Sequence, residues 1–573
     1  MKNRVRNVSL LLTVGAALLV VLVLGLRFWK LGTLPKTLYI DEVAMLADAK
    51  ALVETGRDMN GNGWFQAIFP SYGDYKMPVY LWTVYVSSLI FGPSNFAVRF
   101  PSAVAGIATV LIVYSILQNL SKRYRKRAIP AVHAVWVTCL SVGVSPWAIQ
   151  FARTGFEAYL GQLLLGTGVL LLLHSRKRIS WLLGASAVAL LATYTYFSVR
   201  YVWVPVYLTW VIVELSITKD LSAGRHWIKR VFVSVLPLVF FLMGMLPLFN
   251  SRYYHDSMQF RLSTPSVLEQ DAYVVQANEY RQIAGNGLFD RAVAHRWYFA
   301  FQSFAKNLSV QLSPGFLFVS GDANLRHGTG VYGLFLLPLI LPTILGVYVL
   351  ARREKRVLLL FLVWVVSAAI PAAVPLEVPH ALRFLNALIP ISVLVAVGLF
   401  EFWQVVYSRK WPKLLQHSIV AGYGALLFFF IASFTCYYFS VYPSLSASAW
   451  EQEITEVAIA STPYLANEES VAIVGMHDKF FLWLLAYGPY PGSELSQFTT
   501  ESFDSRSIPG VHFQFPFLAD QKQIVIIPTE LYTSSYMRQL QERDLVFTVD
   551  STFVTSGGFE YSVGRVTNEP QEN

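Results

Sequence analysis

The sequence predicts an all-α polytopic membrane bundle followed by a small α/β domain. Of its 573 residues, 55% are hydrophobic and 14% are charged, which is typical of a membrane protein. Long apolar segments recur through residues 1–443. Residues 444–573 instead carry strand-like pieces at Val471–Val474, Gln523–Ile527, Leu545–Val549 and Glu560–Val566, with helical patterns between some of them. We therefore expect a transmembrane domain over 1–443 and a soluble α/β domain over 444–573.

The first apolar segment, Val8–Leu26, follows Lys2, Arg4 and Arg6. It is long enough to cross a bilayer, and no small-residue cleavage site follows it, so we expect an uncleaved anchor with a cytoplasmic N-terminus. Further apolar segments bring the predicted spans to about eleven. They lie at about 96–118, 128–145, 158–173, 180–198, 200–216, 231–249, 331–351, 357–375, 384–406 and 417–441.

Basic residues cluster in short loops that alternate along the chain. These loops are Lys122–Arg127, Arg176–Arg178, Lys219–Arg230, Arg352–Arg356 and Arg409–Lys413. The positive-inside rule assigns all of them to the cytoplasm, which explains the net charge of +10 through topology and anionic lipid, with no nucleic-acid partner. We therefore predict a multi-pass protein of the plasma (inner) membrane.

Pro78–Phe91 is apolar but short for a crossing, and counting it as a span would invert the loops that follow. We expect a juxtamembrane helix at the outer interface. The first outer loop is then 28–95, a second is 250–330, and residues 444–573 also lie outside.

Adjacent acids, Asp41 and Glu42, stand just after the anchor on the outer side. Ionisable groups near a bilayer are costly and usually functional, which favours Asp41 as a catalytic carboxylate. The alternative is structural: Asp41 as the N-cap of a helix that runs to Glu54 and stops at Gly56, with Glu42 in its first turn.

Several basic residues break the topological trend by lying on the outer side. A phosphate held at the membrane edge would explain them, since arginine binds phosphate in a bidentate manner. Snorkelling to lipid headgroups or pairing with nearby acids is the alternative for each. The candidates are Lys76, Arg99, Arg153, Arg200, Arg326, His327, His380 and Arg383.

Three further acids have open roles. Glu157 follows Arg153 by four residues, so on one helix the two could form a salt bridge or act directly. Asp322 lies in a glycine-rich stretch that suits a turn, and Asp74 could pair with Lys76 or bind a ligand. Two cysteines inside apolar segments indicate neither a disulfide framework nor a zinc pattern.

Several short motifs resemble the bacterial members of the GT-C glycosyltransferase superfamily, closest to the protein-mannosyltransferase and aminoarabinose-transferase-like group. The resemblance covers roughly residues 1–440. The motifs are Tyr39-Ile40-Asp41-Glu42, Lys76-Met77-Pro78-Val79-Tyr80, Phe91-Gly92-Pro93-Ser94-Asn95-Phe96-Ala97-Val98-Arg99-Phe100-Pro101-Ser102, Ser145-Pro146-Trp147 through Glu157, and Gly321-Asp322 through His327.

This resemblance implies a multi-helix membrane enzyme whose donor is a polyprenyl-phosphate-linked sugar. The family acid falls on Asp41, with Glu42 beside it, and the phosphate-contacting lysine falls on Lys76. This chain has Lys-Met-Pro-Val where relatives often have a proline doublet. We expect inverting transfer to an acceptor hydroxyl of a protein, lipid or glycan at the extracytoplasmic face, with Asp41 as base. The scheme needs no cofactor and no metal site is predicted, although Asp41 or Glu42 could bind a divalent ion.

Two other functions fit part of the pattern. A transporter or flippase of lipid-linked glycans would also need outer arginines and a hydrophobic groove, but its ionisable groups would follow a path across the bilayer. A non-catalytic subunit of glycan assembly would keep the fold without turnover. Ionisable residues gathered at one face favour the enzyme.

Overall fold

The structure is a computed structural model, and it describes most of the chain in two compact units. Unit 1 contains Met1–Trp29 and Ser102–Ser440, and unit 2 contains Lys30–Pro101 and Val441–Asn573. The first predicted outer loop thus belongs to the same unit as the C-terminal segment. The described residues are 2–125, 128–175, 179–218, 225–263, 265–267, 271–467, 470–476, 479–498, 508, 510–513, 516, 523–531 and 536–568. The predicted basic loop Arg176–Arg178 and residues 219–224 lie outside them.

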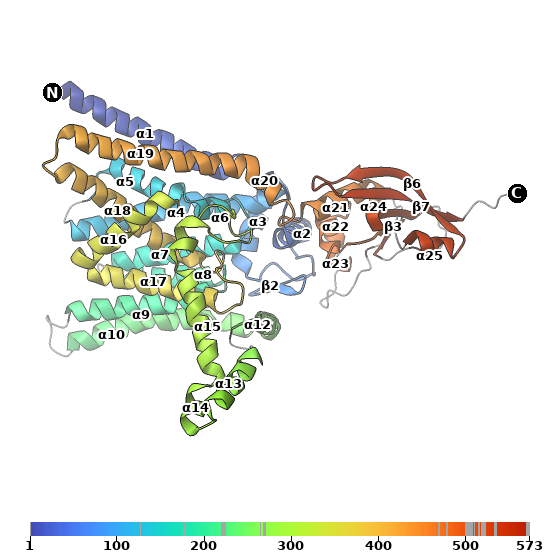
Figure 1. Cartoon of the computed structure of the whole chain (residues 1–573), viewed down its shortest axis with the longest axis horizontal. Coiled ribbons are helices and arrows are strands. Elements are labelled where there is room, and N and C mark those ends of the chain that lie inside the picture. Colours follow the sequence, from blue (N-terminus) through green and yellow to red (C-terminus); the bar gives the residue numbers. More distant parts are fainter. Residues whose placement is uncertain are drawn as a thin grey trace. The chain divides into compact units, whose positions relative to one another are not determined.

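Unit 1 is a bundle of helices, many of which run alongside one another (Figure 1). Its main helices are α1 (Lys2–Phe28), most of α4 (Asn95–Tyr124), α5 (Ala131–Thr138), α6 (Pro146–Ala152), α7 (Glu157–His174), α8 (Ile179–Thr193), α9 (Val199–Thr218), α10 (Arg225–Gly244), α11 (Leu246–Phe249), α12 (Tyr254–Leu262), α13 (Asp271–Ala284), α14 (Leu288–Val293), α15 (Arg296–Gln311), α16 (Ile340–Arg353), α17 (Lys355–Ala373), α18 (Leu388–Ser408) and α19 (Lys413–Cys436). Short π- and 3₁₀-turns adjoin several of them: η1 (Cys139–Gly143), η4 (Gly315–Val319), η5 (Leu337–Leu339), η6 (Leu385–Ala387) and η7 (Tyr437–Val441).

Each of the eleven predicted spans overlaps helical structure, although the span at 231–249 covers both α10 and α11 and the span at 331–351 begins before η5. Within the described residues, seven helices are long and apolar enough to cross a membrane, or eight if the bent pair Ala131–Gly143 and Pro146–Ala152 is one span. The other predicted spans correspond to α8, α9 and α16. These findings support a multi-pass membrane protein.

Glycines allow two helices of unit 1 to cross in backbone contact. A Cβ atom at Gly346 of α16 would lie 1.9 Å from the carbonyl oxygen of Leu394, and one at Gly398 of α18 would lie 1.7 Å from that of Pro342. Small residues at such crossings let membrane helices pack closely. α18 is buried along most of its length, so this crossing lies at the centre of the bundle.

Unit 2 joins the first outer loop to the C-terminal segment. Its N-terminal elements are α2 (Ile40–Thr55), β1 (Phe69–Ser71), β2 (Asp74–Lys76) and α3 (Pro78–Phe91). Its C-terminal elements are α20 (Tyr442–Leu445), α21 (Gln452–Ala466), β3 (Ser470–Ile473), α22 (Phe481–Tyr487), η8 (Gly492–Glu494), α23 (Leu495–Phe498), β4 (Val511–His512), β5 (Gln523–Pro528), α24 (Thr529–Leu531), α25 (Met537–Gln541), β6 (Leu545–Val554) and β7 (Glu560–Asn568).

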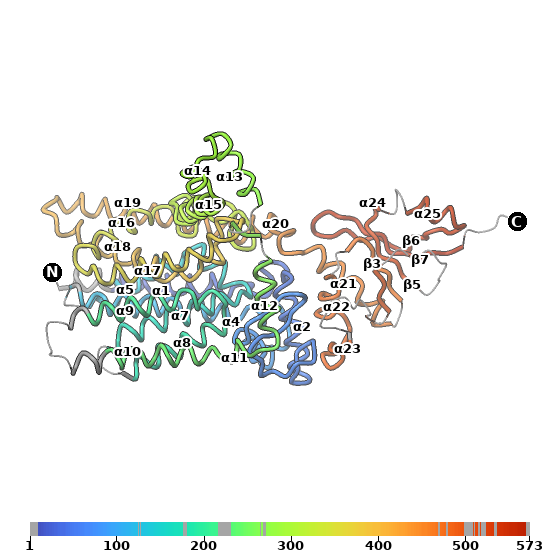
Figure 2. The backbone as a smooth tube through the Cα atoms, turned by 90° about the horizontal axis from the view of Figure 1, so that it is seen from below, coloured from blue at the N-terminus to red at the C-terminus, as the bar shows by residue number. Residues whose placement is uncertain are grey.

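The C-terminal strands form one mixed sheet in the order β4-β3-β5-β7-β6, which Figure 2 shows at the red end of the chain. β3 pairs in parallel with β4 and β5, whereas β7 pairs antiparallel with β5 and β6. Apolar side chains such as Val525, Ile527 and Phe547 are buried in its core. The predicted strands all appear in this sheet, so the α/β assignment is confirmed.

The helix expected to begin at Asp41 begins at Ile40, and its N-cap is Tyr39. The expectation that Asp41 caps this helix was therefore wrong. The carboxylate of Glu42, at the third helical position, accepts the backbone N–H of Tyr39 at 3.4 Å instead. The predicted stop is confirmed, because Gly56 has φ 70° and its N–H bonds to the carbonyl of Leu52. Asp41 is thus free of the capping role.

Candidate functional site

A hairpin and a helix of unit 2 bring one group of predicted residues together. β1 and β2 pair antiparallel, with Ser71 opposite Asp74, so only Tyr72 and Gly73 form the turn. Both have positive φ, 34° and 89°, as the favoured two-residue hairpin turn requires. A tyrosine in this region of φ is strained, and such strain often occurs at functional sites.

The centre of this group is the ammonium nitrogen of Lys76. It lies 2.7 Å from Oδ1 of Asp41 and 2.6 Å from Oδ2 of Asp74. The hydroxyl of Tyr72 donates to the same oxygen of Asp41. The lysine side chain is 9% exposed, whereas those of Asp41 and Asp74 are 22% and 17% exposed. The two carboxylates therefore remain partly accessible to solvent, whereas the ammonium group between them is buried. We call Asp41, Tyr72, Asp74 and Lys76 the Asp41 cluster.

Electrostatics keep Asp41 ionised. Burial alone would raise the pKa of its carboxyl, but the charge of Lys76 and hydrogen bonds from Lys76 and Tyr72 outweigh burial and hold the pKa below its ordinary value. Burial and the neighbouring Asp41 charge raise the pKa of Tyr72 well above its ordinary value, so its hydroxyl stays a donor. The carboxylate of Asp41 is thus an anion that the ammonium group of Lys76 and the neutral hydroxyl of Tyr72 hold in place.

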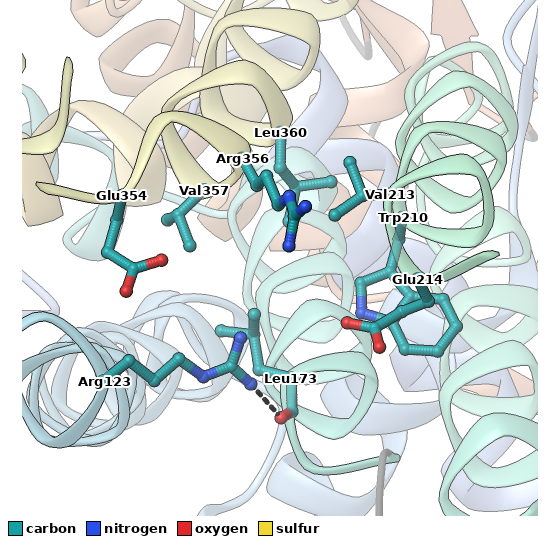
Figure 3. A pocket seen from close by; sticks show the side chains of 9 residues that line it. All are labelled: Arg123, Leu173, Trp210, Val213, Glu214, Glu354, Arg356, Val357 and Leu360. Atoms are coloured by element: carbon teal, nitrogen blue, oxygen red, sulfur yellow. Dashed lines mark hydrogen bonds between the residues drawn. The ribbon is translucent and has the colours of Figure 1, made fainter. Parts of the chain in front are cut away.

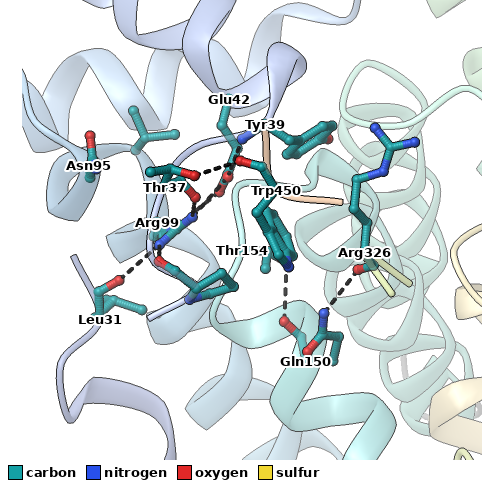
Figure 4. Close-up of polar contacts among 12 residues, drawn as sticks. Leu31, Thr37, Tyr39, Glu42, Asn95, Arg99, Gln150, Thr154, Arg326 and Trp450 are labelled. Carbon is teal, nitrogen blue, oxygen red and sulfur yellow. Dashed lines mark hydrogen bonds and ion pairs between the residues drawn. The ribbon is translucent and has the colours of Figure 1, made fainter. Parts of the chain in front are cut away.

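Glu42, the neighbouring acid, has a different environment (Figure 4). Its carboxylate accepts Nε of Arg99 at 3.0 Å and Nη2 at 3.1 Å, and both side chains are fully buried. Arg99 also donates to the backbone carbonyls of Pro35 at 2.7 Å and Thr37 at 2.5 Å. Glu42 and Arg99 therefore fix the start of α2 in this structure, and a direct catalytic role for Glu42 stays a prediction.

In unit 1, a cavity of about 550 Å³ combines an apolar wall with arginines. Arg383 and Arg261 line it together with Phe197 and residues at the end of α17. The guanidinium of Arg200 lies 4.1 Å from the centre of the Phe197 ring, and that of Arg261 lies 4.3 Å from it. Among the residues that the structure describes, buried nitrogens of Arg200 (Nε and Nη2) and Arg383 (Nη1) have no hydrogen-bond partner. These features suit an amphipathic anion.

A second cavity of unit 1, of about 360 Å³, lies at the other ends of the same helices (Figure 3). It is lined by Arg123, Glu214 of α9, and Glu354 and Arg356 at the start of α17. Arg123 and Arg356 belong to two loops that the charge pattern assigns to the cytoplasm, and both side chains line this cavity. Because α9 rises about 1.5 Å per residue, roughly 20 Å separates Arg200 from this cavity.

Arg153 is fully buried and bonds to the backbone of unit 1. Its Nη1 donates to the carbonyls of Leu26 and Arg27 at 3.1 and 3.3 Å, and its Nη2 donates to that of Trp29 at 2.8 Å. It therefore satisfies the C-terminal carbonyls of α1. The expectation that Arg153 and Glu157 share a helical face was wrong, because α6 ends at Ala152 and α7 begins at Glu157.

The predicted residues Asp322, His327 and His380 meet in the interior of unit 1, and all three are buried. Burial raises the pKa of Asp322 to about 6. Burial, with the charges of Arg326 and Arg383, lowers the pKa of His327 to about 3, and burial is also the main reason that the pKa of His380 lies well below its ordinary value. Arg326 is fixed through its backbone, whose carbonyl accepts Nε2 of Gln150 at 3.0 Å (Figure 4).

Sequence reasoning missed three residues of these sites. Tyr72 could have been found from the Tyr-Gly pair between two short strand patterns. Lys479, which lies 5.1 Å from the centre of the Tyr72 ring, comes from the C-terminal segment, and no local signal pointed to it. Arg261 lies in the predicted second outer loop, and its position beside Phe197 depends on tertiary structure.

No protein-family model matches the chain. A curated protein of Bacillus subtilis (strain 168), named "Putative mannosyltransferase YycA", is 26% identical over 196 residues, which are 34% of this chain and 27% of that protein. The match therefore spans about a quarter of the relative's length. Its name agrees with the family resemblance in the sequence.

Structural matches to this chain include two solved structures. The apo oligosaccharyltransferase of Archaeoglobus fulgidus is 12% identical, with a TM-score of 0.48 over 98% of this chain and 74% of that one. ArnT from Cupriavidus metallidurans bound to undecaprenyl phosphate is also 12% identical, with a TM-score of 0.48 over 96% and 98% of the two chains. At this level of similarity, neither structure bears on what this chain binds.

Proposed function

We propose that the protein is an integral membrane glycosyltransferase that moves a sugar from a polyprenyl-phosphate donor to an acceptor hydroxyl at the extracytoplasmic face. The observation that carries this proposal is the contact of 2.7 Å between Lys76 and Asp41, in which a partly exposed carboxylate is held as an anion. The motif resemblance and the mannosyltransferase name of the curated relative support it.

The chemistry is a single displacement with inversion at the anomeric carbon. The acceptor oxygen attacks that carbon, and Asp41 takes the proton from the acceptor hydroxyl. The bond between the anomeric carbon and the phosphate oxygen breaks, and the lipid phosphate leaves with the electron pair. Lys76 offsets the negative charge that develops on this phosphate. The donor supplies the energy of the step, so no nucleotide is needed.

The lowered pKa of Asp41 makes it a weak base while Lys76 contacts it. A donor phosphate competes with Asp41 for the same ammonium group. When the lysine turns toward the phosphate, burial becomes the dominant influence on Asp41 and its pKa rises. Donor binding would therefore strengthen the base, and the hydroxyl of Tyr72 would keep the carboxylate in place.

Taken by itself, the arginine-lined cavity of unit 1 suits an anionic polyprenyl lipid, because its apolar wall would take isoprene units and its arginines, Arg261 and Arg383, supply positive charge. It lies at the opposite end of α9 from the cavity that contains Arg123 and Arg356. If those basic loops are cytoplasmic, as the positive-inside rule indicates, the arginine-lined cavity is extracytoplasmic. This supports the predicted face of the reaction.

Proteoliposomes with a panel of labelled polyprenyl-phosphate sugars test the function. We expect one label to move from lipid to an added protein, lipid or glycan acceptor fraction, and Asp41→Asn to abolish the transfer at unchanged protein abundance. Asp550→Asn, a substitution at a surface acid paired with Arg565, is the control and should transfer normally. Full activity of Asp41→Asn would refute the base, and label that crosses the bilayer without changing carrier would indicate a transporter.

A further inference from the structure

Three side chains of unit 1 converge in a way that the proposed transfer reaction does not use. One carboxylate oxygen of Asp322 and one ring nitrogen each of His327 and His380 lie within 4.8 Å of one another. The three residues are 3%, 8% and 4% exposed. We propose that they form a binding site for a divalent transition-metal ion of the zinc class.

An unsatisfied polar atom points to a ligand here. Nδ1 of His327 is buried without a hydrogen-bond partner in the described part of the chain, and it lies 3.8 Å from Oδ2 of Asp322. Buried polar groups are nearly always paired, so such an atom calls for an explanation. The rings of His327 and His380 stack with their centres 4.5 Å apart, so neither ring donates to the other.

The donor set fits zinc in type and spacing. Zinc binds imidazole nitrogen and carboxylate oxygen at about 2.1 Å, so tetrahedral ligands lie roughly 3.4 Å apart. The separation of 3.8 Å between Asp322 and His327 needs to close by only a few tenths of an ångström. The positive charges of Arg326 and Arg383 disfavour binding of a cation, whereas the negative charges of Asp322 and Glu377 reduce this repulsion.

Outer contacts already hold the ligands. Asp322 accepts the backbone N–H groups of Asn324 at 2.9 Å and Ala381 at 2.7 Å, and the backbone N–H of His380 donates to Oε1 of Gln311 at 2.9 Å. Such contacts orient metal ligands and tune their affinity. The backbone N–H of Arg383 approaches Nδ1 of His380 at 3.4 Å, which is a weak contact.

The metal would join two segments that are distant in sequence. Asp322 and His327 lie in the loop after η4, whereas His380 lies in the connection between α17 and η6. Arg326 is adjacent to His327, and Arg383 follows His380 by three residues. An ion bound here therefore fixes the backbone beside both arginines, which makes its ligands positioning residues. The metal site itself does not depend on the proposed transfer reaction.

Metal analysis of the full chain in detergent tests the inference. The protein is treated with a chelator, dialysed against micromolar zinc and then against metal-free buffer, and analysed by mass spectrometry. We expect about one zinc ion per chain in the wild type, and loss of this ion in Asp322→Asn and in His380→Gln. The control is His417→Gln, a substitution at an exposed histidine of α19 that should retain the ion.

Cobalt gives a readout that is independent of activity. Cobalt-loaded wild type should show the visible absorption of a low-symmetry site with nitrogen and oxygen ligands, and Asp322→Asn should not. Wild-type protein that retains less than about a tenth of a zinc ion per chain overturns the proposal, whatever the fate of the variants. Zinc retained equally by wild type and Asp322→Asn also overturns it. Sugar transfer without bound zinc would leave the proposed function standing.

Discussion

Arg99 donates from Nε and Nη2 to the two carboxylate oxygens of Glu42, at 3.0 and 3.1 Å, and neither side chain is exposed to solvent. This bidentate contact joins the first turn of α2 to the first turns of α4. Glu42 is adjacent to Asp41, so the ion pair fixes the backbone that carries the proposed base.

Glu42→Gln should destabilise unit 2 strongly, because it leaves the guanidinium of Arg99 buried without a countercharge. Removing one partner of a buried pair costs about 3–5 kcal/mol. Thermal unfolding of the full chain in detergent measures the loss. The matched control is Asp550→Asn, which breaks an exposed pair with Arg565 and should cost less than about 1 kcal/mol. Equal melting temperatures for the two variants would contradict the structural role of Glu42.

Lys76→Met should shift the acid limb of the transfer rate to higher pH and lower the maximal rate. Asp41 must be ionised to accept a proton, and Lys76 holds its pKa below the ordinary value against burial. Without the lysine, burial raises that pKa, so more of the carboxyl is protonated at any given acidic pH. The measurement is kcat/KM for the donor against pH, which reports the free enzyme in which Lys76 contacts Asp41, with Lys306→Met, at an exposed lysine, as control. An unmoved acid limb would exclude this coupling.

The sequence predicted those parts of the fold that depend on local patterns. Pro78–Phe91 forms α3 with the predicted bounds, because proline starts the helix and Gly92 ends it. The strand-like pieces of the C-terminal segment became β3, β5, β6 and β7 because their apolar runs are short and bounded by turns.

Features set by tertiary contacts escaped prediction. The break between α6 and α7 separates Arg153 from Glu157, whose spacing of four would place them on the same face of a single helix. Lys479 reaches the Tyr72 ring from a segment about four hundred residues away, and only the assembled unit shows this. The convergence of Asp322 and His327 with His380 likewise has no local spacing pattern.

Gly398→Ala should disrupt unit 1, since the added methyl group would lie 1.7 Å from the carbonyl oxygen of Pro342 and 2.9 Å from the backbone nitrogen of Gly346. Backbone atoms cannot rotate away, so α16 and α18 must separate, at a cost of about 3 kcal/mol or more. Gly422→Ala in α19 meets no atom within 4 Å and should change stability by less than about 1 kcal/mol. Detergent-solubilised yield and melting temperature compare the two.

In metal-free protein, the contribution of Asp322 to stability should be lost as pH rises through about 6, whereas the lowered pKa values of His327 and His380 act in the opposite direction, so Asp322→Asn is needed to isolate it. The folded state raises the pKa of Asp322 from 3.8 to about 6, so its stabilising contribution is complete below pH 3.8 and is lost as pH rises through about 6. The shift corresponds to about 3 kcal/mol. Melting temperatures of chelator-treated protein below and above pH 6 measure it. The melting temperature of the wild type minus that of Asp322→Asn should fall as pH rises through about 6, and a difference that does not change with pH would exclude the shift.

Gly73→Ala should weaken both the hairpin and the transfer reaction. Gly73 has φ 89°, and a Cβ atom added there would have no neighbour within 4 Å, so strain of the backbone is the only expected effect. An L-residue at this φ costs about 1–2 kcal/mol, and the turn that suffers it orients Tyr72 and Lys76 toward Asp41. Gly63→Ala also meets no atom within 4 Å and lacks a positive φ, so it should behave as wild type. Transfer rate and melting temperature are measured for both variants. If Gly73→Ala is less stable than Gly63→Ala but transfers sugar at the wild-type rate, the turn does not align the Asp41 cluster for catalysis.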